Sequence, residues 1–152
     1  MIKEPTMPHP HALSDDRFLA DFLACRLPAA GFDHWSHLRA AWLLLQRHPL
    51  EEAVERCCDG IARLATHLGV PGKYHRTLSE ALVRLIAVAG AVDQPWPDFL
   101  AANPNLVNDA RGLLSRYYSP ERLADPLASS TFLSPDLAPL PPCPPLPSPP
   151  AP

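Results

Sequence analysis

The chain has 152 residues, of which 47% are hydrophobic and 19% are charged, and its formal net charge is -3. These values are typical of one globular domain, and they give no electrostatic reason to expect nucleic acid or an anionic membrane as a partner. No apolar run is long enough for a membrane span and no signal-peptide pattern is present, so we expect a cytoplasmic protein.

Both ends of the sequence are rich in proline, which has no N–H to donate and fixes φ. Residues 1–13 are predicted to form a flexible arm, and residues 139–152 a disordered or polyproline II tail. No basic residue flanks this tail, so an inert tail is favoured over a PxxP ligand. A single helical domain is expected over residues 14–138.

Within this domain the apolar spacing is that of helices, and we find no convincing strand. Ser14 can cap a first helix whose apolar stripe includes Phe18 and Phe22. A second helix is predicted from near Asp33 to about His48, and its end is set by the proline that follows.

A third helix is predicted to begin at Pro49 and to end at Gly69, and a fourth to run from about His75 to Ala91. Shorter helices are expected at 96–102, 107–117 and 120–130. The predicted fold is therefore all-α, a compact bundle of four main helices plus about three short C-terminal helices.

The four cysteines, Cys25, Cys57, Cys58 and Cys143, show no metal-binding spacing. Two of them are adjacent and the other two stand alone. We therefore predict free thiols in a reducing compartment. The high content of arginine, alanine, leucine and proline is consistent with a bacterial source that has a GC-rich genome.

Three histidines are in phase with the core-facing sides of the predicted helices. On the second helix, His34 lies near the centre of the apolar arc and His37 lies inside it. His75 is in phase with the apolar arc of the fourth helix, if that helix includes it. A buried imidazole that is left unpaired costs roughly 1–3 kcal/mol, so each ring needs a partner.

An i,i+3 histidine pair and a third histidine from a facing helix can supply three nitrogen ligands to zinc, iron or copper. The sequence therefore predicts a histidine-lined core pocket that binds a divalent transition metal through His34, His37 and His75. No carboxylate is clearly placed to complete the site, which weighs against a metal.

Two alternatives stay open. The first is a non-catalytic domain for a small ligand or a protein partner, in which the histidines are structural. The second is a metal-free enzyme with a histidine as general base. Arg39, Tyr74 and Tyr117 are candidate ligand-binding residues, because an arginine can bind an anion and tyrosines can donate hydroxyls. Neither the substrate nor the reaction follows from the sequence, and a homo-oligomer is possible.

The segment 32–42 resembles the FxHxxHLRxAW stretch of a family of small, uncharacterised bacterial helical proteins. A KYHxT segment at 73–77, an Asn103-Pro104 pair and Tyr117-Tyr118-Ser119 extend the resemblance over about residues 14–138. It implies a family and a pairing of the two histidine segments, but no activity. Arg76 stands where a glutamate is typical of the family, so a role that needs an acid there is not implied.

Overall fold

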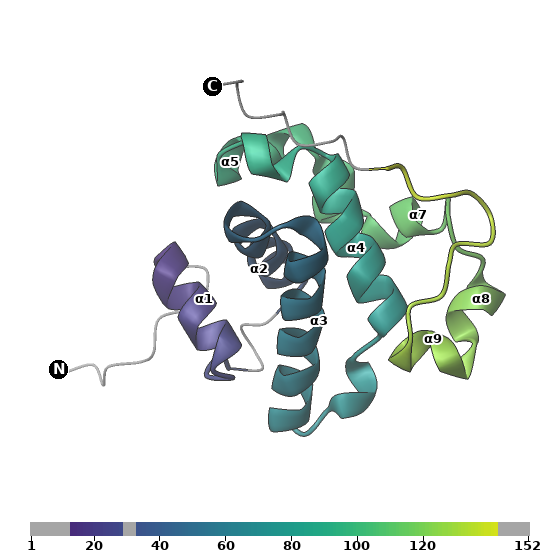
Figure 1. Ribbon diagram of the computed structural model, residues 1–152, viewed down its shortest axis with the longest axis horizontal. Coiled ribbons are helices and arrows are strands. Elements are labelled where there is room, and N and C mark those ends of the chain that lie inside the picture. The colour runs from purple at the N-terminus through teal and green to yellow at the C-terminus, as the bar shows by residue number, and fades with distance from the viewer. Residues whose placement is uncertain (1–12, 29–32, 143–152) are drawn as a thin grey trace, which may run out of the picture.

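The structure is a computed structural model that describes residues 13–28 and 33–142. Helices make up its regular structure, and no strand occurs in these two ranges, so the expected all-α class is confirmed (Figure 1). Residues 1–12 of the predicted N-terminal arm and most of the proline-rich tail lie outside the described residues. Residues 139–142, where the predicted tail begins, are neither helix nor strand.

The first helix begins after the cap that the sequence predicts, and the second begins near its predicted start at Asp33. Helix α1 (Asp15–Leu23) follows Ser14, whose hydroxyl accepts a backbone N–H of the first turn. Helix α2 (His34–Arg47) follows Asp33, whose carboxylate accepts the N–H of Ser36 at 3.0 Å. These bonds satisfy N–H groups that have no partner inside the helix, and the second of them fixes the turn that carries His34 and His37.

Helices α3 (Leu50–His67) and α4 (Arg76–Val88) pack against each other and against α2, and α1 lies beside α2 and α3 (Figure 1). A short 3-10 helix, η3 (Pro71–Lys73), joins α3 to α4. The core between these helices is apolar, and its largest fully buried side chains include Phe18, Phe22, Leu38, Leu44, Leu64 and Ile86. No helix in the described part of the chain is long and apolar enough to cross a membrane.

The C-terminal third folds into short elements. They are η4 (Ala91–Asp93), α5 (Trp96–Ala102), α6 (Pro104–Asn108), α7 (Ala110–Leu114), α8 (Pro120–Ala124) and α9 (Pro126–Ser130). Where the sequence predicts single helices over 107–117 and 120–130, the structure has breaks. Asp109 and Asp125 interrupt these stretches because each caps the helix that follows it.

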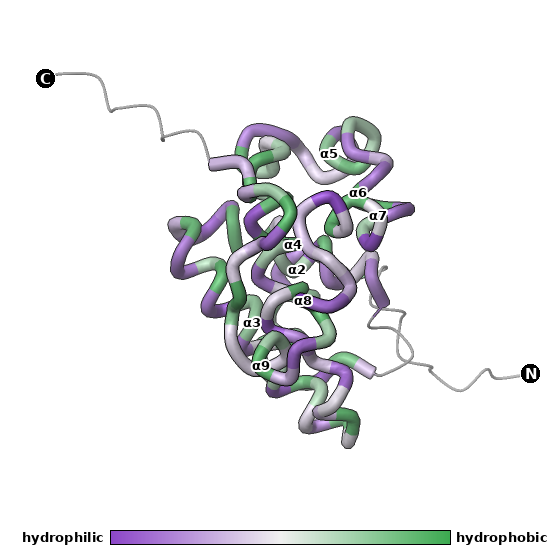
Figure 2. The backbone as a smooth tube through the Cα atoms, turned by 90° about the vertical axis from the view of Figure 1, so that its right-hand side faces the viewer, coloured by the Kyte–Doolittle hydropathy of each residue, from purple (hydrophilic) through white to green (hydrophobic). Residues whose placement is uncertain are grey.

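Helices α8 and α9 and the segment after them cover the side of α4 that faces away from α3 (Figures 1 and 2). The hydroxyl of Thr77, fully buried on α4, lies 2.8 Å from the carbonyl oxygen of Ala128 and accepts the N–H of Leu133 at 3.1 Å. The Tyr118 hydroxyl donates to the carbonyl of Leu133 at 2.8 Å. This side of α4, which helical periodicity predicts to be polar and exposed to solvent, is therefore buried.

Glu80, on the same helix, is a buried charged residue, since only 4% of its surface is exposed. Helical periodicity places Glu80 opposite the apolar arc of α4, where a charged side chain is ordinarily exposed, but here it is buried. Its carboxylate binds Arg76 at 2.7 Å and Arg84 at 2.9 Å. These arginines also reach Glu55 and Glu51 on α3. The five side chains form a continuous ion-pair network between α3 and α4.

Candidate functional site

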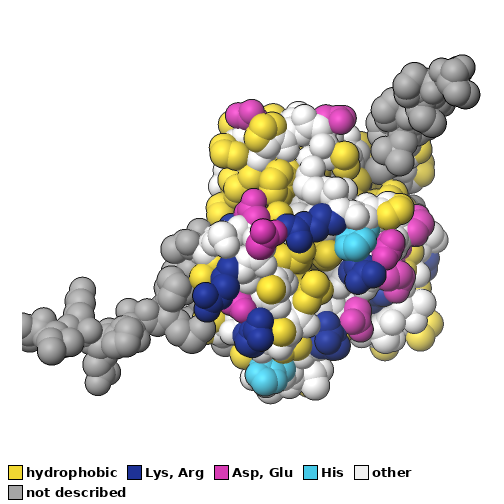
Figure 3. All heavy atoms as spheres, turned by 60° about the vertical axis from the view of Figure 1, so that its left-hand side comes forward, with side chains coloured by type: hydrophobic (Ala, Val, Ile, Leu, Met, Phe, Trp, Pro, Cys, Tyr) yellow, Lys and Arg dark blue, Asp and Glu magenta, His cyan; other side chains and the backbone are white. Residues whose placement is uncertain are grey.

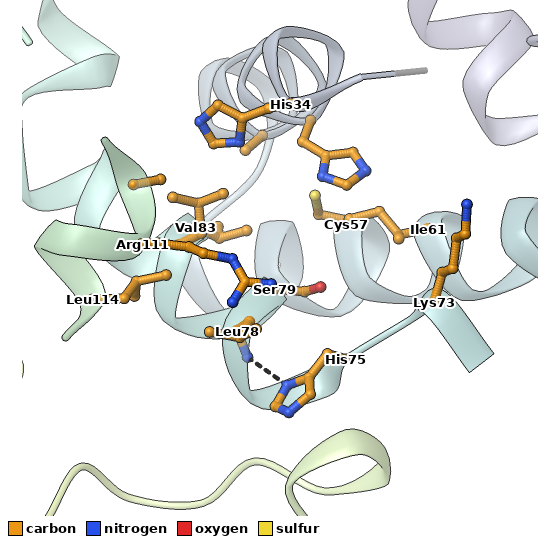
Figure 4. Close-up of a pocket in the computed structure, with 14 residues that line it drawn as sticks. His34, Cys57, Ile61, Lys73, His75, Leu78, Ser79, Val83, Arg111 and Leu114 are labelled. Atoms are coloured by element: carbon orange, nitrogen blue, oxygen red, sulfur yellow. Dashed lines mark hydrogen bonds between the residues drawn. The ribbon is translucent and has the colours of Figure 1, made fainter. Parts of the chain in front are cut away.

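The main pocket is a cavity of about 250 Å³ between α2, α3, α4 and α7 (Figure 4). Its polar wall consists of His34, His37, Lys73, His75, Ser79 and Arg111. Its apolar wall includes Ala41, Ile61, Leu78, Leu82, Val83 and Leu114, and the thiol of Cys57 lies among them. No aspartate or glutamate of the described chain lines it.

His34 lies in the first turn of α2, half-buried at the edge of the main pocket. Its Nε2 donates to the carbonyl oxygen of Leu106 at 2.7 Å, which ties α6 to the start of α2. The same bond fixes the tautomer of the neutral ring, with the proton on Nε2. Nδ1 is then the ring nitrogen that can accept a hydrogen bond.

His37 lies one turn further along α2 and is also half-buried. Burial lowers its pKa to about 4, and the neighbouring His34 lowers it further, against a smaller opposing effect of Asp33. Its imidazole is therefore neutral at pH 7. A neutral imidazole carries one N–H donor and one acceptor, so His37 offers the pocket polarity without charge.

His75 is the cap of α4 and not part of the helix, whose first residue is Arg76. Its Nδ1 accepts the N–H of Leu78 at 3.1 Å, and its Nε2 donates to the carbonyl of Leu123 at 3.0 Å. Figure 4 shows the ring at the margin of the main pocket, with the bond to Leu78 dashed. Because both ring nitrogens are engaged, the role of His75 here is structural.

The two cations of the main pocket, Lys73 and Arg111, have no hydrogen bond or ion pair through their side chains with any described residue. Every described arginine that precedes Arg111 in the sequence does pair with a carboxylate. Figure 3 shows such pairing on one face of the molecule, where basic and acidic side chains lie next to each other. In Figure 4 the Arg111 guanidinium reaches across the pocket toward Ser79, and Lys73 stands on the opposite side.

Cys57 presents its sulfur to the main pocket from α3 (Figure 4). Its side chain is almost fully buried, and burial raises the pKa of the thiol well above its usual range. The reactive form of cysteine is the thiolate, so Cys57 is a poor nucleophile at neutral pH. Cys57 therefore forms part of the apolar wall of the main pocket.

The other candidate residues are placed differently. Arg39 is buried and lines neither the main pocket nor any other described cavity, because it binds Asp15 at 2.8 Å and the carbonyl of Leu13 at 2.7 Å. It joins α1 to α2. Tyr74 lines a second cavity next to the main pocket, and Tyr117 packs against the core without lining either.

The three candidate metal ligands line one pocket but do not form a ligand cluster. Within the described residues, no group of three or more His, Cys, Asp or Glu side chains is arranged to hold a metal ion. A site shared by His34, His37 and His75 would require His75 to give up a helix cap or its link to α8. The three-histidine metal site therefore stays a prediction that this geometry does not support.

Comparison with known proteins leaves the pocket as the main guide to function. No family model, curated protein sequence or solved structure matches the chain. The resemblance carried by the FxHxxHLRxAW and KYHxT segments stays a prediction. The two segments do lie together, since both contribute to the main pocket.

Sequence reasoning did not single out Lys73, Cys57 or Arg111 as site residues. Lys73 lies in a connection, and Arg111 lies on a short helix that the pattern places only approximately. One signal was available for Arg111: no carboxylate stands three or four residues away to pair with it on a helix.

Proposed function

We propose that the main pocket binds a small organic anion, with a carboxylate as the simplest case. The observation that carries this proposal is the pair of cations, Lys73 and Arg111, at a cavity whose described lining contains no carboxylate. The described arginines that precede Arg111 in the sequence are all paired with a carboxylate. A cavity with uncompensated positive charge is complementary to an anion.

The lining also supports an organic rather than an inorganic anion. The guanidinium of Arg111 has the fork geometry that binds a carboxylate with two parallel hydrogen bonds, and Lys73 adds a second charge. Neutral His37 adds polarity to the lining without adding charge. The apolar wall, which includes Ile61 and Leu114, favours a ligand with a hydrocarbon portion. Free thiols at the described cysteines support a location in the reducing cytoplasm.

The test is calorimetric titration of the protein at pH 7 with hexanoate, hexan-1-ol and hexylamine, which differ only in the head group. We expect hexanoate to bind and the alcohol and amine to bind at least tenfold more weakly. A hydrogen-bonded charge contributes about 1.5–3 kcal/mol. The Lys73→Gln/Arg111→Gln variant should therefore lose at least tenfold in hexanoate affinity.

The matched control is Arg116→Gln, since Arg116 is also an exposed arginine without a described carboxylate partner but does not line the pocket. It should bind hexanoate as the wild type does. Equal affinity for hexanoate and hexan-1-ol would contradict the proposal.

A parallel titration with ZnCl2 tests the metal site. Stoichiometric zinc binding that is lost on His34/His37/His75→Ala, without hexanoate binding, would favour the metal over the anion.

A further inference from the structure

A second cavity, the side cavity, adjoins the main pocket. It has a volume of about 230 Å³ and lies between the C-terminal half of α3 and the connection to α4. Its walls are formed mainly by Leu64, Ala65, Leu68, Val70 and Tyr74. Burial raises the pKa of Tyr74 to about 12, so its hydroxyl stays protonated and adds no charge.

The two cavities share three lining residues, His37, Ile61 and Lys73. Each volume alone falls below the roughly 300–1,000 Å³ of typical small-molecule sites, and the two volumes together fall within that range. Their linings differ in character. The main pocket holds Arg111, Ser79 and the histidines, whereas the side cavity is apolar apart from the shared residues and Tyr74. A ligand that fills both must be polar at one end and apolar at the other.

We infer that the ligand is an amphipathic carboxylate of medium chain length, whose head group lies at Arg111 in the main pocket and whose alkyl tail extends past Lys73 into the side cavity. This inference rests on the proposed function and adds the substrate class. Lys73 and His37 line both cavities, so the alkyl chain of the ligand passes between the two cavities beside them. The Lys73 ammonium adds positive charge near the carboxylate, and the neutral ring of His37 adds none. Leu64, Leu68 and Val70 then bury the tail.

The experiment is a calorimetric series with hexanoate, octanoate and decanoate at pH 7, below the concentrations at which they form micelles. Burying one methylene contributes about 0.8 kcal/mol, which corresponds to a roughly fourfold gain in affinity. Because the side cavity is partly open, we expect Kd to fall about two- to fourfold for each added methylene until the cavity is full. Decan-1-ol should bind at least tenfold more weakly than decanoate.

Two variants test the position of the tail. Ala65→Phe fills the side cavity and should remove the gain from octanoate and decanoate while hexanoate binds as before. Its matched control is Thr66→Phe, on the exposed side of the same helix. Val70→Asn, at an exposed position, makes the cavity more polar with less risk to folding. It should weaken decanoate several-fold, and Val92→Asn, at another exposed valine, should not.

The outcomes separate the two proposals. Hexanoate binding without any effect of chain length, or a full gain that survives in Ala65→Phe and Val70→Asn, would overturn the inference and leave the anion site standing. If no carboxylate binds, both proposals are wrong. If decan-1-ol binds as tightly as decanoate, the cavities recognise only hydrocarbon and the anion site is overturned.

Discussion

The imidazole of His75 links two helices that are far apart in the sequence, because its Nε2 lies 3.0 Å from the carbonyl oxygen of Leu123. Its Nδ1 at the same time caps α4. A histidine with both nitrogens satisfied by backbone groups stabilises the fold, and this relationship separates His75 from His34 and His37 at the same pocket.

Replacing His75 should therefore reduce stability. We expect His75→Ala to lower the free energy of unfolding by about 1–2 kcal/mol, since it removes a helix cap and the bond to α8. His75→Asn should recover about half of that loss, because asparagine can cap a helix but cannot reach Leu123. Urea denaturation followed by circular dichroism gives both values. Wild-type stability for His75→Ala would contradict the structural role.

Neutralising the buried carboxylate of Glu80 should reduce the stability of the fold. Glu80→Gln leaves Arg76 and Arg84 half-buried beside a neutral amide, and we expect a loss of roughly 1–3 kcal/mol. The control is Glu52→Gln, which breaks an exposed pair with Arg56 and should cost less than about 0.5 kcal/mol. Equal effects in the two variants would contradict a buried ion-pair network around Glu80.

Stability should fall on acidification because of His37. The folded protein keeps this ring neutral down to about pH 4, whereas the unfolded chain protonates it near its ordinary pKa of 6.5. Protons therefore bind the unfolded state first, and stability is lost as the pH falls from about 6.5 toward 4. Between pH 7 and pH 5 the expected loss is about 1–2 kcal/mol.

The matched measurement for this pH effect is the same denaturation series on His37→Gln, which cannot titrate in this range. Its stability should depend less on pH between 7 and 5 than that of the wild type. An unchanged slope in the variant would show that His37 is not the group responsible. Arginines lower the pKa values of Glu51 and Glu55, so these carboxylates stabilise the folded protein at neutral pH. That stabilisation is lost only below their ordinary pKa of 4.5, outside the range from pH 7 to pH 5.

The contact between α1 and α3 depends on Gly60. A Cβ at this position would stand 2.6 Å from Cζ of the buried Phe22 ring. We expect Gly60→Ala to cost about 1–3 kcal/mol, because overpacking outweighs the higher helix propensity of alanine. Gly72→Ala, where nothing lies within 4 Å of the added Cβ, should change stability by less than about 0.5 kcal/mol. A thermal denaturation series compares the two.

The parts of the fold that local signals control could be predicted from the sequence. Ser14 caps the first helix as predicted, the second helix begins next to Asp33 near its predicted start, and α5 occupies the expected range. The breaks at Asp109 and Asp125 were missed. An aspartate inside an apolar period is compatible with either a continuous helix or a new cap, and only packing decides between them.

The pocket was predictable only in part. His34, His37 and His75 line one cavity, as their positions on the apolar arcs suggest. Helical periodicity could not show that both ring nitrogens of His75 form hydrogen bonds with backbone groups. The lack of a helical carboxylate partner marks Arg39 as well as Arg111. Arg39 finds Asp15 on another helix, and this tertiary contact, invisible in the sequence, separates a structural arginine from a candidate ligand-binding one.

The most direct test of the anion pocket is a two-dimensional 1H–13C NMR titration of the folded protein with decanoate, observing histidine ring and methyl resonances. The account predicts saturable shifts for His37, Ile61 and Leu68, and none for Leu127, which is exposed on α9 outside both cavities. The shifts should be lost in the Lys73→Gln/Arg111→Gln variant. Shifts that are absent, that never saturate, or that centre on Leu127 would contradict a carboxylate site at these cavities.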